Sequence, residues 1–466
     1  MKKEISVFKS LVPIFFLIVT ILLNNLYGNG ESMLPLIASI CVASFIAIAH
    51  GWTWQELEDG IMHSLGLVFQ PILILMIIGM IIGSWILSGV VPTIIIYGLE
   101  LLSPKSFLVA TVLVCSFIAV ATGSSWTTIG TIGVALVGIG HGLGIPSGMT
   151  AGAIVSGAYF GDKMSPLSEN TNLGSGILGV NLYEHIRYLL YTSIPSMILA
   201  LILFALVGAK YSGTSFDQSQ VDLIIEGIHS QFVISPWLLL VPLTILVVVL
   251  LKVPAIPGLM VSFAVGSLAA IFVQGASLPD VVEAAQFGYL SDSGVEIVDK
   301  LLSKGGLDNM MYTVSLIIAA MSFGGLLEQC GMLTSIIEKV EQFIKRRWSV
   351  IASATLASTA INICTGDQAL SVILSSRMFK DLFEHHDLDL KNLSRCTSDG
   401  GVVTSPIVPW NVCGVFVAST LGVSTLSYLP YSFFNLISPL MSIVFGVLGI
   451  KILTKKRKED SNENNK

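Results

Sequence analysis

The amino-acid sequence predicts an all-α protein that crosses the membrane many times and contains two repeats of opposite orientation. Three observations lead to this fold class: an apolar composition, a series of long apolar runs, and polar landmarks that recur in the same order. Of the 466 residues, 53% are hydrophobic and only 12% are charged, against roughly 25% charged residues in soluble domains. This composition excludes a soluble enzyme, and the net charge of −6 leaves no basic surface for nucleic acid.

Apolar runs of membrane-spanning length occur along the whole chain. A helix crosses a hydrocarbon core of about 30 Å with roughly 17–25 residues. Such runs lie at 9–27, 33–50, 64–88, 106–121, 188–209, 236–251, 257–274, 310–330, 347–363 and 430–453. Between Gly60 and Gly161 the charged residues are Glu100 and Lys105 alone. Together with the interrupted segments described below, the runs predict about 10–12 membrane-spanning helices in contact with the lipid bilayer.

The basic residues in the flanks indicate the orientation of the chain. Lysines at the N-terminus and the basic clusters at 345–347 and 455–458 should lie in the cytoplasm. The segments 210–235 and 276–309 are acidic and are expected outside. Both termini are therefore predicted to be cytoplasmic, and the first run is expected to remain as a helix and not to be cleaved as a signal peptide.

Recurring landmarks divide the chain into two copies. The matched features, first copy before second, are Gly51 and Gly275, Gly83 and Gly325, Gly89 and Gly331, Thr122-Gly123 and Thr365-Gly366, and Ser165-Pro166 and Ser405-Pro406. The predicted orientation makes the copies antiparallel, an arrangement common in secondary transporters. The expected organisation is an N-terminal helix at 1–32, repeat 1 at 33–209, an external loop and linker helix at 210–255, repeat 2 at 256–453, and a basic and polar tail at 454–466.

Each copy contains two elements that polar residues interrupt. The interruptions lie at 122–125 and 161–172 in the first copy, and at 365–368 and 399–411 in the second. The elements at 106–140 and 347–380 are either re-entrant hairpins with polar tips or pairs of full crossings. The elements at 147–187 and 395–423 are expected to be discontinuous helices, because Gly and Pro open a helix and free its backbone groups. Broken helices in matching positions point to a transport site.

Four carboxylates fall inside these interruptions: Asp162, Glu169, Asp367 and Asp399. A charged side chain at the bilayer centre costs about 2.5–3.5 kcal/mol, so each carboxylate needs water, a cation, a proton or a basic partner. We expect a sodium ion at Asp162, Glu169 and Asp367. Lys163 is expected to compensate a carboxylate when the site is empty.

The alternative for these carboxylates is a purely structural ion pair. Asp162 could pair with Lys163, and Asp399 with Arg395. Glu100 and Glu328 lie near the ends of apolar runs and are expected at the membrane interface, outside the site.

Hydroxyl and amide oxygens next to the carboxylates suit an alkali ion. The candidates are Thr122, Ser124, Ser125, Ser165, Asn170, Thr171 and Asn172 in the first copy, and Thr365, Thr404, Ser405 and Asn411 in the second. The alternative for these residues is that they cap the broken helices and bind backbone groups. The six cysteines and seven histidines show no metal-binding spacing, and no cofactor is expected.

Two stretches resemble the NhaC family of bacterial sodium/proton antiporters: GDKMSPLSENTN at 161–172, preceded by SGAYF, and TGSSWTTIGTIG at 122–133. The resemblance covers essentially the whole chain. It implies a location in the bacterial cytoplasmic membrane and a fold with two hairpins and two broken helices. Family members include simple sodium/proton exchangers and an exchanger of malate and protons against sodium and lactate. The resemblance supports a site at Asp162, Ser165, Glu169, Asn170 and Asn172.

We therefore expect a secondary transporter, not an enzyme, which exports sodium in exchange for protons by alternating access. Sodium ions and protons would compete for one carboxylate. The alternative is a sodium- and proton-coupled exchanger of small carboxylates such as malate and lactate. A buried arginine would favour such anions, but Arg377 and Arg395 only flank the interruptions.

A channel would need a rotationally repeated pore ring, and a membrane enzyme a His-, Ser- or metal-based constellation. Neither pattern is present. The sequence leaves open the stoichiometry, the selectivity among alkali ions, and whether the chain forms a homodimer.

Overall fold

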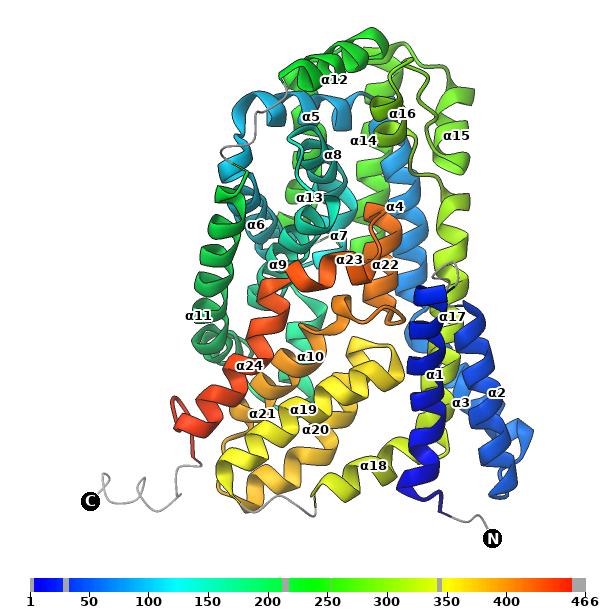
Figure 1. The fold of residues 1–466 in the computed structure, drawn as a ribbon, viewed down its shortest axis with the longest axis vertical. Coiled ribbons are helices and arrows are strands. Elements are labelled where there is room, and N and C mark those ends of the chain that lie inside the picture. Colours follow the sequence, from blue (N-terminus) through cyan, green and yellow to red (C-terminus); the bar gives the residue numbers. More distant parts are fainter. Residues whose placement is uncertain (1–3, 28–32, 212–217, 252, 342–345, 455–466) are drawn as a thin grey trace.

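The computed structural model describes residues 4–27, 33–211, 218–251, 253–341 and 346–454 (Figure 1). Within these ranges the regular structure is helical, apart from an isolated antiparallel bridge between Leu388 and Thr454. The first half contains α1 (Val7–Tyr27), α2 (Met33–Ala49), α3 (Trp54–Leu67), α4 (Phe69–Leu87), α5 (Val90–Leu101), α6 (Pro104–Thr122), α7 (Ser125–Thr128), η1 (Ile129–Gly133), α8 (Val134–Gly142), α9 (Ser147–Met164), α10 (Glu169–Leu178), α11 (Leu182–Ala209) and α12 (Gln218–Gln231). The second half contains η2 (Pro236–Leu239), α13 (Leu240–Leu250), α14 (Ala255–Gln274), α15 (Leu278–Phe287), α16 (Glu296–Leu302), α17 (Leu307–Gln329), α18 (Met332–Glu341), α19 (Arg347–Thr365), α20 (Gln368–His385), α21 (Leu390–Thr397), η3 (Ser398–Val402), η4 (Ser405–Ile407), α22 (Val412–Leu421), α23 (Thr425–Tyr428), η5 (Leu429–Tyr431) and α24 (Phe433–Leu448).

The predicted class, an all-α protein that passes the membrane several times, is confirmed. Seven helices in the described ranges are long and apolar enough to cross a bilayer, or up to nine if each bent helix pair counts as one span. Three shorter apolar helices, α1, α2 and α5, accompany them. Large apolar side chains of the apolar helices are exposed, and lipid would cover them. Examples are Phe15 on α1, Phe117 on α6 and Phe272 on α14.

The two ends of the molecule differ in what they carry. Figure 1 shows the first turn of α1, the last turn of α24 and α18 at one end, and α12, α15 and α16 at the opposite end. This agrees with the prediction that the acidic segments 210–235 and 276–309 lie on the side away from the termini. Which end faces the cytoplasm stays a prediction.

The acidic segment at that opposite end is held by the carboxylate of Asp299. Its Oδ1 accepts hydrogen bonds from the backbone N–H of Ser293 at 2.7 Å and from the hydroxyls of Ser293 and Ser291, both at 2.8 Å. The backbone hydrogen bond from Ser293 is the main cause that lowers the pKa of Asp299 below its usual value. The loop before α16 is therefore ordered by an ionised carboxylate.

The first polar interruption of each copy forms the tip of a hairpin. The helix α6 ends at Gly123, whose φ of 70° is left-handed, and Ser124 then caps α7. In the same way α19 ends at Gly366, with φ 69°, and Asp367 caps α20. Figure 1 shows α19 and α20 side by side in the half of the molecule that holds the termini, whereas α8 leads back toward α5 at the opposite end. The geometry thus favours re-entrant hairpins that enter from opposite ends.

The second interruption of each copy is shorter than predicted. The helix α9 continues through Asp162 and Lys163, so the first break covers only residues 165–168. Pro166 explains this boundary, because a proline disfavours the helical conformation of the residue before it, and Ser165 is extended. In the second copy Asp399 lies in the π-helical turn η3, and the break follows it. The prediction that Asp162, Glu169 and Asp399 lie inside the breaks is therefore wrong, since all three lie on helical turns beside them.

Matched landmarks of the two copies share their local conformation. Left-handed glycines recur as pairs at Gly51 and Gly275, Gly89 and Gly331, Gly123 and Gly366, and Gly179 and Gly422. Thr53 before α3 and Ser277 before α15 both form capping boxes. These recurrences are consistent with the expected inverted repeats.

Replacing Gly123 by alanine is expected to destabilise the protein more than the same change at Gly179. Both glycines have left-handed φ, which costs an L-residue roughly 1–2 kcal/mol. A Cβ at Gly123 would in addition lie 2.6 Å from the backbone carbon of Leu167 in the first break, whereas a Cβ at Gly179 meets open space. Thermal unfolding of the purified variants in detergent measures the difference. Equal melting temperatures for the two variants would contradict the close packing of the hairpin tip at Gly123 against Leu167 in the first break.

Candidate functional site

A cavity of about 400 Å³ lies where the hairpin tips and the broken helices meet, and we call it the central cavity. Its walls come from α4, α13 and α14, from the tip between α6 and α7, from the start of α10, from the tip between α19 and α20, and from the start of α22. Its polar lining consists of Thr122, Ser124, Ser125, Thr127, Asp162, Glu169, Asn170, Asp367 and Gln368. Seven of these nine residues are sequence-predicted site residues, and they come from both copies.

Asp162 lies on the last turn of α9 and is only 3% exposed. One carboxylate oxygen, Oδ2, accepts hydrogen bonds from the hydroxyl of Ser125 at 2.7 Å and from its backbone N–H at 3.3 Å. The other oxygen, Oδ1, makes no well-formed hydrogen bond among the described residues, and the polar side chains of Ser168 and Asn170 lie near the carboxylate. The hairpin tip therefore orients the carboxylate, and one buried acceptor remains available for a ligand.

The other two carboxylates of the central cavity are held more loosely. Glu169 begins α10, and its Oε1 accepts a hydrogen bond from the Gln70 side chain at 3.0 Å. Asp367 is buried and caps α20 by accepting the N–H of Leu370 at 2.8 Å. Next to Asp367, the amide oxygen of Gln368 is buried and has no partner among the described residues.

The central cavity has a strongly acidic lining. Its described residues include three carboxylates and no lysine, arginine or histidine. The three do not converge on one point, since no group of three or more His, Cys, Asp or Glu side chains in the described ranges could hold a metal ion together. Sodium at Asp162, Glu169 and Asp367 stays a prediction, and its remaining ligands would be hydroxyl, amide and backbone oxygens.

Several predicted ligands lie outside the lining of the central cavity and make local hydrogen bonds. Ser165 accepts the N–H of Leu167, Thr171 donates to the carbonyl of Lys163, and Asn172 donates to the carbonyls of Pro166 and Ser168. In the second copy the corresponding residues are Thr365, Thr404, Ser405 and Asn411, which bind backbone groups or Asn362. Local hydrogen bonds to backbone groups and to Asn362 account for these seven side chains, as in the alternative considered from the sequence.

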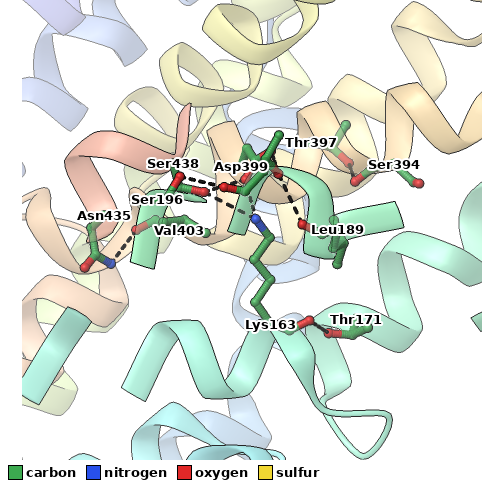
Figure 2. A network of polar contacts seen from close by, with 11 residues as sticks. Lys163, Thr171, Leu189, Ser196, Ser394, Thr397, Asp399, Val403, Asn435 and Ser438 are labelled. Carbon is green, nitrogen blue, oxygen red and sulfur yellow. Dashed lines mark hydrogen bonds and ion pairs between the residues drawn. The ribbon is translucent and has the colours of Figure 1, made fainter. Parts of the chain in front are cut away.

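Lys163 pairs with Asp399 and not with a carboxylate of the central cavity (Figure 2). Both side chains are 0% exposed. Thr192 on α11 donates to Asp399 Oδ2 at 3.0 Å, and Ser438 on α24 contacts both the lysine ammonium and the aspartate. The two structural pairs considered from the sequence, Asp162 with Lys163 and Asp399 with Arg395, do not form among the described ion pairs. Lys163 and Asp399, which come from different halves of the chain, pair with each other instead.

Arg395 is fully buried but does not line the central cavity. Its guanidinium lies over the ring of Tyr188, with 4.8 Å between the guanidinium carbon and the ring centroid. Its Nη1 donates a long hydrogen bond of 3.5 Å to the carbonyl of Lys451. The arginine therefore belongs to the packing of α21 against α11 and offers nothing to an anion in the cavity.

Each copy contributes a hairpin that packs against the broken helix of the other copy. The indole of Trp126 stacks on the ring of Phe416 in α22, with centroids 4.2 Å apart and planes 4° from parallel. The helix α10 packs along α20. The central cavity thus lies between the two predicted copies, the position that a transport site takes in transporters built from inverted repeats.

Comparison of this sequence with known proteins shows the family to which the chain belongs. A family model described as "Na+/H+ antiporter family" matches residues 157–450. The "Na(+)/H(+) antiporter NhaC" of Alkalihalophilus pseudofirmus is 38% identical over 97% of this chain and 98% of that protein. The "Malate-2H(+)/Na(+)-lactate antiporter" of Bacillus subtilis is 35% identical over 95% of each chain. The "Arginine/ornithine antiporter ArcD" of Halobacterium salinarum is 37% identical over 99% of this chain and 96% of that protein.

Removing one partner of the Lys163–Asp399 pair is expected to destabilise the fold more than replacing both. A lone buried charge costs about 3–5 kcal/mol, whereas a matched neutral pair recovers most of that loss. Lys163→Met and Asp399→Asn should each lower the melting temperature, and the double variant should lie closer to the unaltered protein. Thermal unfolding in detergent measures the three variants. If the melting temperature of the double variant falls by the sum of the decreases in the two single variants, Lys163 and Asp399 do not compensate each other's charge.

Proposed function

Because the chain belongs to the Na+/H+ antiporter family, we propose that it exchanges sodium ions for protons across the membrane. The observation that carries this proposal is the free carboxylate oxygen of Asp162 in the acidic central cavity. An ionised carboxylate attracts a cation, and a protonated one does not. Sodium ions and protons therefore compete for Asp162, and this competition couples their movements.

The remaining groups of the central cavity complete the proposed sodium site. The hydroxyls of Ser124 and Thr127, the amide of Gln368 and the carboxylate of Asp367 supply oxygen ligands around Asp162. Ser125 keeps the carboxylate in place by two hydrogen bonds. Glu169, near the surface, would concentrate cations at the entrance.

Exchange further requires that only the loaded forms of the carrier reorient. A carboxylate that holds neither a proton nor a sodium ion is costly to enclose in a low-dielectric interior. The empty, ionised cavity is therefore held open to water on one side. In the proposed direction, protons enter the cytoplasm and sodium leaves through the cytoplasmic membrane of a bacterial cell.

Exchange of small carboxylates is a weaker candidate for this chain. The relative from Bacillus subtilis is named for malate and lactate. The cavity is large enough for such anions, but three carboxylates line it and no basic side chain is among its described residues. An organic anion there would meet like charges without a bidentate partner. We therefore assign the sodium and proton exchange to this chain first.

Purified protein in liposomes with a trapped pH indicator tests the proposal. A sodium gradient alone should drive proton movement, and Asp162→Asn should abolish it, since an amide cannot alternate between proton and cation. Glu328→Gln is the control, because Glu328 is a half-buried carboxylate on α17 outside the lining of the central cavity. Unaltered exchange in Asp162→Asn, or an equal loss in the control, would refute the role of Asp162.

Malate and lactate on opposite sides of the same liposomes separate the two candidates. The proposal predicts that sodium-driven proton movement changes less than twofold when both acids are added. Proton movement that occurs only in their presence would assign the chain to organic-acid exchange instead.

A further inference from the structure

The central cavity is much larger than a sodium ion needs. Its volume of about 400 Å³ is the size of a site for a small organic molecule. Much of its lining is apolar, contributed by Pro71, Ile74, Leu167, Ile245, Val248 and Leu259. Such side chains cannot replace the water shell of an alkali ion, but they bury carbon chains favourably.

Buried acceptor oxygens in the lining of the central cavity lack hydrogen-bond donors. Among the described lining residues, the buried polar side-chain atoms without a partner are two acceptors, Asp162 Oδ1 and Gln368 Oε1, and one donor, Trp126 Nε1, so acceptors outnumber donors. Asp162 comes from repeat 1 and Gln368 from repeat 2, so a donor group between them would join the copies. A sodium ion can satisfy acceptors of this kind, and so can an ammonium group, which carries three N–H donors.

The negative charge of the central cavity and its aromatic lining both favour an organic cation over an anion or a bare metal ion. Three carboxylates face the cavity without a basic side chain among its described residues, which repels anions. The indole of Trp126 also lines it, and although one face of this ring is covered by Phe416, the other face is left for an ammonium group, which aromatic faces attract. The carboxylates are spread along the cavity and do not share one metal site. A ligand with an ammonium at each end of a short methylene chain would meet two of them.

We propose that the central cavity binds an aliphatic organic cation, a primary amine or diamine, in competition with sodium. The ammonium group donates to Asp162 and Gln368, the methylene chain lies against the wall formed by Ile74, Ile245 and Leu259, and a second ammonium pairs with Glu169 or Asp367. The inference rests on the proposed function, because it places the amine on the carboxylates of the proposed sodium site.

Calorimetric titration of purified protein with 1,4-diaminobutane and with butylamine, in a potassium buffer without sodium, tests the inference. Both amines should bind, the diamine more tightly, and added sodium should weaken each. Loss of a hydrogen bond to a charged group makes the affinity in Asp162→Asn at least about tenfold weaker. Glu328→Gln should bind like the unaltered protein. Tetramethylammonium, which has no N–H donor, should bind more weakly than butylamine, and succinate, an anion of similar length to the diamine, should not bind.

The possible outcomes separate this inference from the proposed function. If neither amine binds while sodium still drives proton movement in liposomes, the inference is wrong and the antiporter stands. If an amine binds but sodium neither displaces it nor drives proton movement, the cavity is an amine site and the proposed sodium exchange fails. Amine binding that survives Asp162→Asn unchanged places the ligand elsewhere and overturns the inference.

Discussion

The constraint on which the structure depends is that backbone N–H and C=O groups cannot be left without partners in the membrane interior. Each broken helix exposes such groups, and a hairpin tip supplies partners for them. In the second copy the N–H of Val412 donates to the carbonyl of Gly366 at 2.8 Å, and Asn411 binds Asn362. In the first copy the partner runs the other way, because the backbone N–H of the tip residue Ser125 donates to the side chain of Asp162 at the end of α9. The breaks and tips therefore gather at one place, and the central cavity forms there.

The buried charges of this region separate into two groups with different consequences. Lys163 and Asp399 neutralise each other between the copies, with Thr192 and Ser438 as further hydrogen-bond partners. A pair of this kind contributes little net stability, but losing one member is costly, so it fixes which surfaces of the copies meet. The charge of the central cavity is then determined by its own carboxylates, and Lys163 does not cancel it.

Much of the fold was predictable, because the apolar runs, the glycines that end helices and the prolines that break them act locally. The carboxylates of the central cavity were also predictable, since an acidic residue in an apolar run is costly wherever it lies. The Lys163–Asp399 pair joins residues 236 positions apart and leaves no local signal, so the two structural pairs considered from the sequence, Asp162 with Lys163 and Asp399 with Arg395, were not the ones that form. Gln368 was missed as a site residue although it follows Asp367 directly, because a neutral amide does not stand out. Serine and threonine caps cannot be told from ligands by residue type alone.

The central claim is that sodium and protons share the carboxylate of Asp162, and proton release on sodium binding tests it most directly. Calorimetric titration of the purified protein with sodium, repeated in buffers with different ionisation enthalpies, counts the protons released. The account predicts that protons are released when sodium binds, that the apparent sodium affinity falls as the pH is lowered, and that proton release is absent in Asp162→Asn. Sodium binding without proton release in the unaltered protein, at every pH where it binds, would contradict the account.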